Sequence, residues 1–298
     1  MSAARAARSH GTGAWSVSGG RWTSATRGAT ELTGPGTLAP SSGDTFDAVI
    51  VGAGAAGLSL ACHLAHAGWG RDVLLVDDGS FPLEQRSWAW WSTGGGLLDS
   101  AASNAANQLL VAGPGWRRRL ALAPYTYRTI TGPDLSAAAD RLLGARRGYR
   151  RVRGRVGAIT REKATSRVTI DLLDSDEARP VEVRARWVFD SVGPGSPLSG
   201  SSSTMNLEFL GLHVECTSDA FEPGAPTLMD FRTDQSAGAA FVYVLPTSAR
   251  TALVERTVFV PPHAHDGDLV PLSHEVHVRD YVRAHLGGGS YRVTGREA

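Results

Sequence analysis

The fold is decided by residues 46–78, which read FDAVIVGAGAAGLSLACHLAHAGWGRDVLLVDD. The apolar run over 46–51 predicts a buried strand, and the small and apolar residues over 58–67 predict a helix. A second apolar run over 72–77 predicts another buried strand, which ends in an acidic residue. The stretch therefore reads as strand, glycine turn, helix and strand, a unit that is typical of α/β folds.

The glycine turn has the spacing of a dinucleotide-binding site. Gly52 permits the tight turn, Gly54 lets the backbone approach a pyrophosphate, and Gly57 lets the helix pack closely on the sheet. The N-terminal end of the helix supplies free amides and a positive dipole end for phosphates. Asp77, about twenty residues further on, can bond a ribose hydroxyl, and Asp78 is the alternative ligand. A packing turn without a ligand is the competing interpretation.

The sequence that follows favours FAD over NAD. Residues 167–173 and 181–185 read as a hairpin, and an apolar strand is expected over 187–190. In flavoproteins with two dinucleotide-binding motifs, an inserted β-meander is followed by a strand that ends in an acid and a glycine. We therefore predict that Asp190 and Gly193 contact the flavin nucleotide.

Length and composition set wide bounds. The 298 residues carry a formal net charge of +1 and only two cysteines. This length allows a large core with two subdomains, and the charge demands neither nucleic acid nor an acidic partner. Cys62 and Cys216 lie far apart, so a reducing compartment fits better than a disulfide. No stretch reaches the ~18–20 apolar residues of a spanning helix, and the N-terminus lacks a signal-peptide pattern.

Several blocks outside the dinucleotide-binding unit resemble those of lycopene β-cyclases of the bacterial type. They include MDFR at 229–232, FVYVLP at 241–246 and ALVERT at 252–257. Further matching blocks lie at 86–91, 127–130 and 207–215. The blocks follow the order and spacing of the family from about residue 46 onward. Residues 291–298 resemble the start of another block, so the chain is expected to end before the family's fold does.

The resemblance implies an α/β fold in which a Rossmann-like FAD-binding domain carries an inserted, mostly β substrate domain. We predict four parts along the chain: a disordered leader, the first part of the FAD-binding domain, a substrate-domain segment, and an incomplete C-terminal part. Their expected bounds are 1–44, 45–204, 205–275 and 276–298. The leader is rich in Ser, Thr, Gly, Ala and Arg, and a transit peptide is its alternative interpretation.

The resemblance also implies an isomerase. Protonation of the terminal double bond of lycopene gives a tertiary carbocation, and the neighbouring double bond attacks it to close a six-membered ring. Loss of a ring proton completes the β-ionone end, through γ-carotene to β-carotene, without net redox change. The family needs reduced FAD, for which NAD(P)H is the expected reductant. Formation of an ε-ring or closure of only one end stays open.

Glu255 is the predicted acid–base carboxylate. It matches the first Glu of the family's F-L-E-E-T-type block and lies in an apolar run, where burial would raise its pKa. The second acid of that block is replaced by Arg256, which departs from the family. Asp230 and Arg232, at i and i+2 of an expected strand, are further catalytic candidates or a structural ion pair.

Other side chains have two interpretations each. Trp88, Trp90 and Trp91 would line a polyene tunnel or belong to the core. Arg86 is predicted to contact the flavin, as an arginine at this place does in related flavoproteins. The basic run over 146–155 is expected to be a solvated face, with anionic lipid as the alternative partner. The His and Asp residues over 263–268 lack recognisable metal-ligand spacing, so no metal is predicted.

The expected partners are lycopene and other carotenoids with acyclic ends, at the surface of a membrane. A cytoplasmic, peripheral location follows, since the substrate lives in the bilayer, and nucleic acid is not expected. Two alternatives remain: a flavin-dependent hydroxylase or prenyl reductase of the same superfold, and an inactive fragment. The block that contains Glu255 argues against the first alternative.

Overall fold

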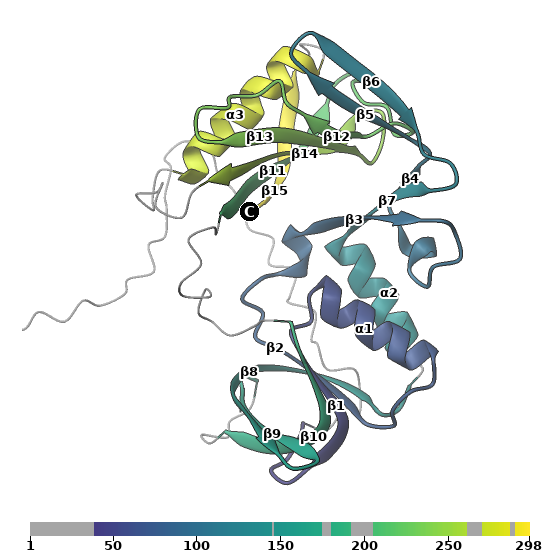
Figure 1. Ribbon diagram of the computed structural model, residues 1–298, viewed down its shortest axis with the longest axis vertical. Coiled ribbons are helices and arrows are strands. Elements are labelled where there is room, and N and C mark those ends of the chain that lie inside the picture. Colours follow the sequence, from purple (N-terminus) through teal and green to yellow (C-terminus); the bar gives the residue numbers. More distant parts are fainter. Residues whose placement is uncertain (1–38, 145, 175–179, 192–204, 261–269, 287–289) are drawn as a thin grey trace, which may run out of the picture. The chain divides into compact units, whose positions relative to one another are not determined.

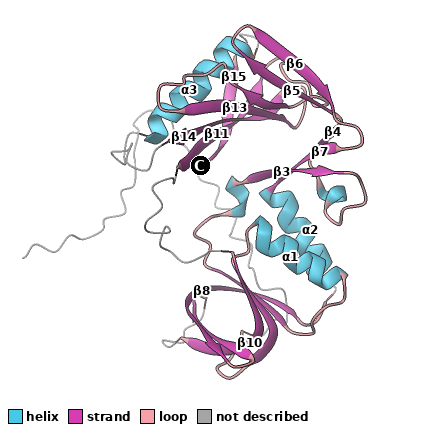
Figure 2. Cartoon of the chain, in the orientation of Figure 1, coloured by secondary structure: helices cyan, strands magenta, loops and turns pink. Residues whose placement is uncertain are grey.

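The structure is a computed structural model, and it confirms the α/β class (Figures 1 and 2). It describes residues 39–144, 146–174, 180–191, 205–260, 270–286 and 290–298. Within these ranges the strands form three sheets. The α-helices of the same ranges are α1 (Ala55–His66), α2 (Gly132–Gly144) and α3 (Val270–His285).

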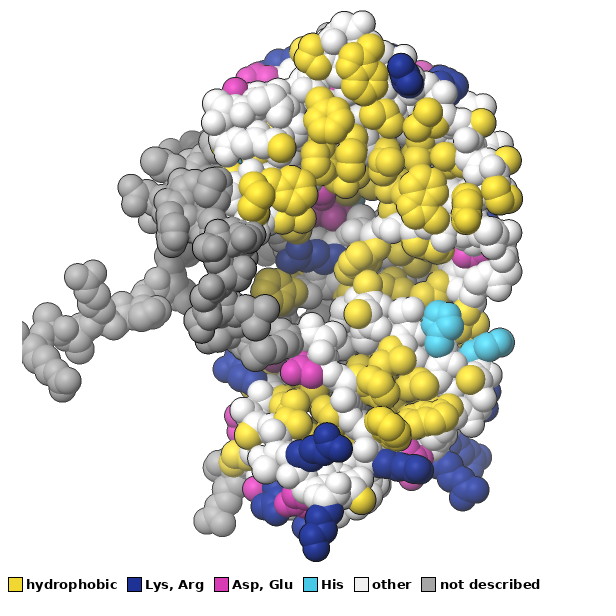
Figure 3. Space-filling model, in the orientation of Figure 1, with side chains coloured by type: hydrophobic (Ala, Val, Ile, Leu, Met, Phe, Trp, Pro, Cys, Tyr) yellow, Lys and Arg dark blue, Asp and Glu magenta, His cyan; other side chains and the backbone are white. Residues whose placement is uncertain are grey.

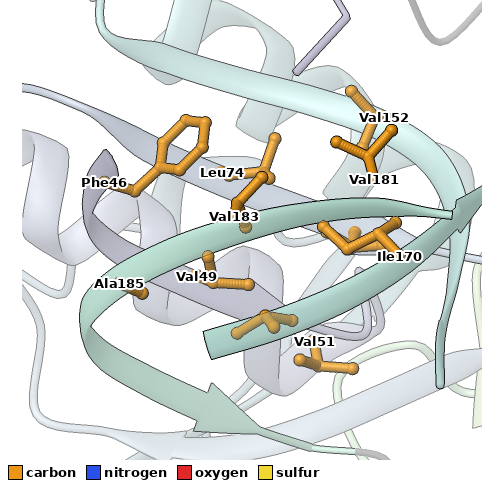
Figure 4. Packing of buried hydrophobic residues seen from close by; sticks show 11 residues of the cluster. Phe46, Val49, Val51, Leu74, Val152, Ile170, Val181, Val183 and Ala185 are labelled. Carbon is orange, nitrogen blue, oxygen red and sulfur yellow. The ribbon is translucent and has the colours of Figure 1, made fainter. Parts of the chain in front are cut away.

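The first sheet closes into a small barrel in the order β1-β10-β9-β8-β2. Its strands are β1 (Thr45–Val51), β2 (Val73–Asp77), β8 (Tyr149–Glu162), β9 (Thr165–Leu172) and β10 (Val181–Asp190). The barrel is filled by apolar side chains from all five strands, among them Phe46, Leu74 and Ile170 (Figure 4). Alternate residues of the apolar runs predicted as strands are buried in this interior. The residues between them in β1 and β2, such as Ile50 and Leu75, pack in a second cluster with α1.

Strand β10 explains the predicted hairpin and corrects the strand expected after it. Its first half pairs antiparallel with β9, with Val181 opposite Ile170, so the hairpin is confirmed. The same strand continues without a break and pairs parallel with β1, with Ala48 opposite Trp187. The prediction of a separate strand over 187–190 was therefore wrong. The continuous strand ends with Asp190 opposite Val51, next to the glycine turn.

The second sheet has seven strands in the order β15-β11-β14-β13-β12-β5-β6. It combines β5 (Gln108–Gly113), β6 (Trp116–Ala121), β11 (Asn206–Cys216), β12 (Thr227–Asp230), β13 (Ala239–Pro246), β14 (Thr251–Val260) and β15 (Tyr291–Glu297). The sheet therefore takes strands from both sides of the expected boundaries at 204/205 and 275/276. Parallel pairing of β5 with β12 brings in the early strands, and pairing of β15 with β11 brings in the last one.

The two faces of this sheet differ because successive side chains of a strand point to opposite sides. One face packs on α3, where Leu212, Val242 and Val254 contact Val278 and Tyr281. The residues that alternate with them belong to the other face. That opposite face carries Phe209, Gly211, Phe241, Tyr243 and Glu255.

A third sheet, in the order β3-β7-β4, links the two larger ones along the chain. It consists of β3 (Ser87–Ser92), β4 (Asn104–Ala106) and β7 (Thr126–Thr131). Two short 3-10 helices flank β3, η1 (Leu83–Gln85) and η2 (Asp99–Ala101). Among the described helices, none is long and apolar enough to cross a membrane.

Candidate active site

The glycine turn between β1 and α1 has the geometry that a dinucleotide needs. Gly52 has a φ of +93°, a conformation that favours glycine. A Cβ on Gly57 would lie 1.9 Å from the carbonyl oxygen of Gly52, so no side chain fits there. A Cβ on Gly54 would meet nothing within 4 Å, which leaves open space beside the turn. The close packing predicted for Gly57 is present, and the pyrophosphate contact of Gly54 stays a prediction.

The N-terminal end of α1 is prepared for phosphate. Gly54 is the N-cap residue, no side chain caps the helix, and its first turn carries no acidic residue. The first-turn amides and the positive end of the helix dipole therefore meet the open side of the turn. These features fit the pyrophosphate of FAD, which Gly52, Gly54 and the helix end would hold.

The two acidic candidates after β2 have different surroundings. Asp77 accepts hydrogen bonds from the backbone N–H groups of Ala53, at 2.7 Å, and Gly79, at 2.8 Å. Asp78 instead accepts from the backbone of Ser80, whose hydrogen bonds hold the pKa of Asp78 below its usual range, with Arg155 nearby. Asp77 is thus the acid beside the glycine turn. Its ribose contact stays a prediction, and each of its oxygens keeps a second lone pair for that role.

The remaining nucleotide candidates can be placed only in part. Asp190 lies at the end of β10, opposite Val51, and the following Ser191 donates a backbone hydrogen bond to the carbonyl of Val51. Asp190 therefore flanks the glycine turn, as a flavin-contacting acid should. Gly193 lies outside the described residues.

Four residues form a row across the seven-stranded sheet, on the face that does not pack on α3. Tyr243 of β13 lies opposite Glu255 of β14, Glu255 lies opposite Gly211 of β11, and Gly211 lies opposite Glu297 of β15. Directly opposed residues of antiparallel strands point to the same face. The row therefore places two carboxyl groups on either side of a glycine.

Gly211 keeps the space between these acids clear. A Cβ at this position would lie 2.7 Å from Leu253 Cδ1 and 3.4 Å from both Cβ and Oε2 of Glu255. A Cβ at this position would therefore require the end of the Leu253 side chain to move and would touch the Glu255 carboxyl at ordinary contact distance. The sequence pattern of β11 did not reveal this close approach of Gly211 to Glu255.

Glu255 is placed to carry a proton at neutral pH. Burial raises its pKa to about 7, and the nearby charge of Glu297 adds to this effect. A hydrogen bond of 3.3 Å from the Thr257 hydroxyl and the positive charge of Arg86 act in the opposite direction. With a pKa near 7, both the acid and its conjugate base are populated at physiological pH, which suits acid–base catalysis.

Glu297 is the acidic residue that sequence reasoning did not assign to the site. It is 4% exposed, and its Oε1 accepts a hydrogen bond of 2.7 Å from Ser87 Oγ. The same oxygen lies 2.7 Å from Nε2 of His213, a residue of β11. Its match to a glutamate in the last family block was the only available signal. The pairing of β15 with β11, which brings it to Glu255, cannot be read from the sequence.

Arg86 lies on the same side as the two acids. Its guanidinium group is 5.7 Å from the ring centroid of Phe209 in β11 and 5.5 Å from that of Phe81, within the range of cation–π contacts. It is also close enough to Glu255 to lower the pKa of that carboxyl. Its predicted contact with flavin remains a prediction.

Asp230 and Arg232 are not brought to Glu255. Asp230 lies opposite Val242, on the face that packs on α3. Its carboxylate accepts two hydrogen bonds from the Arg232 guanidinium, at 2.6 and 2.9 Å, and one of 2.7 Å from the Tyr281 hydroxyl. Burial alone would raise the pKa of Asp230, but these donors hold it below its usual range. The geometry is that of the structural ion pair, the second of the two interpretations.

Arg256 also points to the α3 side. It is buried, lies opposite Val242 and Leu210, and contacts Nδ1 of His274 at 3.3 Å. The position at which the family's block has a second acid therefore faces away from Glu255 in this chain. Its replacement by arginine leaves the face of Glu255 unchanged, where Glu297 supplies the second carboxyl.

Two tyrosines, Tyr243 and Tyr127, lie near Glu255, and further aromatic rings adjoin Tyr243. Phe241 lies next to Tyr243, with ring centroids 5.2 Å apart, and also contacts Phe231 and Phe259. Tyr127 of β7 is close enough for Glu255 and Tyr243 to add to the burial that raises the pKa of Tyr127 to about 12. In Figure 3 hydrophobic side chains gather over the seven-stranded sheet, around a hollow in which acidic and basic groups are visible. The electron-rich faces of such rings can stabilise a carbocation.

The three tryptophans are divided between core and site. Trp88 and Trp90 pack against the core cluster that includes α1, and the indole N–H of Trp90 donates to Asp99. Trp91 is 50% exposed, and its ring lies 5.0 Å from that of Tyr127. Of the tunnel candidates, only Trp91 therefore adjoins the aromatic surroundings of Glu255.

Comparison with known proteins identifies one family and one fold. A family described as lycopene cyclase protein matches residues 47–287. No curated protein matches the chain. The structure is similar to a geranylgeranyl bacteriochlorophyll reductase-like protein from Thermoplasma acidophilum and to a p-nitrophenol 4-monooxygenase from Pseudomonas putida, each at 16% identity and a TM-score of 0.59. It is also similar to a flavin-dependent brominase, at 14% identity and a TM-score of 0.57.

The structural matches cover most of this chain but only part of each similar structure. The matches cover 85% of this chain, and 65%, 67% and 66% of the three structures in turn. The chain thus spans about two thirds of their length. At such identities the similarity establishes the fold alone and leaves the reaction to be argued from the site.

Proposed function

The chain belongs to the lycopene cyclase family, and on this premise we propose that it is an isomerase that closes the acyclic ends of lycopene into β-ionone rings. One closure gives γ-carotene and two give β-carotene. The observation that carries the proposal is Glu255, a partly buried carboxyl whose pKa is raised to about 7 on an aromatic face of the sheet.

The proposed reaction begins with Glu255 in its protonated form. Its O–H bond breaks as the proton adds to the terminal double bond of the substrate, which forms a C–H bond and a tertiary carbocation. The neighbouring double bond attacks the cation and closes the ring. A ring C–H bond then breaks, and its proton returns to the Glu255 carboxylate. Atoms and electrons balance without an external oxidant or reductant, so substrate and product are isomers.

The surroundings of Glu255 support this chemistry. Tyr243 and Tyr127 lie near the acid, and Phe241 adjoins Tyr243. The faces of aromatic rings attract positive charge. The same apolar surface excludes water, which would otherwise trap the cation as an alcohol. The extended apolar face also suits a long polyene better than a small polar substrate.

We propose FAD as the cofactor, with NAD(P)H as its reductant. The open space at Gly54 and the uncapped N-terminus of α1 support binding of its pyrophosphate, and Asp77 and Asp190 flank that turn. When bound in its reduced form, the flavin would supply negative charge and electron density that favour a nearby cation. Arg86, between η1 and β3, would orient the flavin relative to Glu255.

A peripheral position at the cytoplasmic surface of a membrane is part of the proposal. The edge strand β6 is exposed along its whole length, and Trp116 and Leu120 are 45% and 42% exposed. Arg118 lies between them, so one side of the strand combines apolar and basic groups that suit anionic lipid. Replacing both apolar residues, by Trp116→Ser and Leu120→Ser, should weaken co-sedimentation with vesicles of anionic lipid. Unchanged binding would contradict the role of β6.

Expression in lycopene-accumulating cells tests the proposed function. We expect the chain to convert lycopene to cyclic carotenes and Glu255→Gln to abolish this, by about a hundredfold or more. Glu222→Gln, at an exposed glutamate paired with Arg119, is the matched control that should stay active. Hydroxylated or hydrogenated pigments would instead indicate a flavin-dependent oxidoreductase. Unchanged lycopene in cells that contain folded, flavin-bound protein would refute the cyclase assignment.

A further inference from the structure

The two carboxyl groups beside Gly211 have unequal surroundings. Oε1 of Glu297 accepts from Ser87 Oγ and lies at the same distance from the His213 ring nitrogen. Such donors stabilise the ionised form of a carboxyl group. The one hydrogen bond to the Glu255 carboxyl that the described residues show is that of 3.3 Å from Thr257. When two neighbouring carboxyl groups compete for one proton, the group with fewer donors takes it.

From this asymmetry, and resting on the proposed cyclase function, we propose that Glu297 is a positioning residue, held by Ser87 and His213, that keeps its neighbour Glu255 protonated for catalysis. Glu297 does not touch the reacting carbon in this scheme. It acts through Glu255, because two negative charges on either side of a glycine repel each other.

The hydrogen bond from Ser87 to Glu297 connects the pair of acids to the segment that carries Arg86. Ser87 begins β3 and directly follows Arg86, so one short segment carries a donor to Glu297 and a cation near Glu255. His213 is less buried than Glu297, with a side chain 31% exposed. The Glu297 carboxylate is therefore fixed from two strands, β3 and β11, which limits its freedom to turn away from Glu255.

The charged and titratable groups around Glu255 come from four strands and from Arg86, which lies between η1 and β3. Glu297 of β15 favours its protonated form, and Arg86 opposes it. Tyr243 of β13 and Tyr127 of β7 have pKa values raised by burial and by Glu255, so both are neutral near pH 7. His213 of β11 contacts Glu297. Removal of the two charged neighbours, Glu297 and Arg86, should therefore shift the protonation of Glu255 in opposite directions.

The test is a titration of Glu255 by NMR in protein labelled with ¹³C at glutamate carboxyl carbons. Comparison with Glu255→Gln identifies its signal, so the measurement does not depend on activity. We expect Glu297→Gln to lower the titration midpoint of Glu255 by roughly one pH unit, a tenfold change in proton affinity. Arg86→Gln should raise the midpoint. Ser87→Ala, which removes one donor but keeps Glu297, should lower it by a smaller amount.

Cyclisation rates against pH provide the second readout. The alkaline limb for kcat should move to lower pH in Glu297→Gln, with little change in KM, because the acid and not the substrate surface is affected. If Glu297→Gln does not fold, as judged by circular dichroism, Ser87→Ala carries the test. An unchanged Glu255 midpoint in the folded variants would overturn the proposal. Shifted midpoints in a protein that makes no cyclic product would support the effect of Glu297 on Glu255 but refute the cyclase function.

Discussion

Among single residues, Glu255 should make both the stability of the fold and the proposed chemistry depend on pH. Its pKa is raised in the folded state from 4.5 to about 7, so folding favours the protonated form. The stabilisation this gives is complete below pH 4.5 and is lost as the pH rises through 7. A shift of this size corresponds to at most about 3 kcal/mol.

Glu255→Gln should remove that dependence. The variant cannot ionise, so we expect its free energy of unfolding to fall less between pH 4.5 and 7 than that of the wild type. Urea denaturation across this range measures the difference. Glu222→Gln should retain the wild-type slope, because the pKa of Glu222 is lowered by Arg119 and its titration lies below the window. Equal slopes for wild type and Glu255→Gln would show that Glu255 titrates normally.

The sequence allowed Glu255 to be predicted as the acid, a role that stays a prediction, but it did not reveal the neighbours of Glu255. Glu255 was recognisable from an apolar block with a family match, since burial and chemistry are both local features of one strand. Glu297, His213 and Ser87 meet only through pairing of strands that lie far apart in the chain. Asp230 and Arg232 were recognised as a pair, but the face they occupy depends on α3, whose packing their spacing does not reveal.

At the level of elements, two glycines of the turn before α1 have different expected roles, one in the stability of the fold and one in cofactor binding. A Cβ at Gly57 would overlap the carbonyl of Gly52, whereas a Cβ at Gly54 would enter open space. Gly57→Ala should therefore destabilise the fold, by about 1–3 kcal/mol or more. Gly54→Ala should keep the thermal midpoint of the flavin-free protein and weaken FAD binding by roughly tenfold, about 1.4 kcal/mol.

Thermal melts and flavin titration test this pair of variants. Gly57→Ala should lower the melting temperature, and Gly54→Ala should weaken the binding measured by flavin titration. Equal FAD affinity of wild type and Gly54→Ala would mean that the open side of the turn is not the pyrophosphate site.

Helix α3 is tied to β12 by a single buried hydrogen bond among the described contacts, from Tyr281 to Asp230. Tyr281→Phe leaves this carboxylate with one donor fewer, so we expect a loss of about 1–3 kcal/mol in unfolding free energy. Chemical denaturation measures it, and Tyr125→Phe, at a 49% exposed tyrosine, is the control that should change little. The pH profile of activity should keep its midpoint in Tyr281→Phe. A displaced midpoint would assign this cluster a catalytic role.

Element prediction succeeded where the signal was local and failed where it was not. The strand–turn–helix–strand unit was predictable because each part has its own pattern of apolar and glycine residues. The entry of β5 and β6 into the seven-stranded sheet was not predictable. Strand β12, with which β5 pairs, lies more than a hundred residues further along the chain. The continuity of β10 was missed because the run 181–190 changes its pairing partner without any break in its sequence.

For the whole molecule, the fold and the family allow different chemistries. The fold is shared with a monooxygenase and a reductase-like protein, whose similarity here is structural. Family membership and the site at Glu255 favour a reaction that leaves the redox state of the substrate unchanged. The distinction is therefore one of product composition, not of cofactor.

The most direct measurement is the mass of the carotenoid formed in D₂O. Protein supplied with reduced FAD would be incubated with lycopene in vesicles. The pigments would then be separated and their molecular masses measured by mass spectrometry. Proton-initiated cyclisation predicts cyclic carotenes that are isomers of lycopene and carry one deuterium for each ring closed. Glu255→Gln should give none. A product that has gained oxygen or two hydrogens would contradict acid catalysis by Glu255.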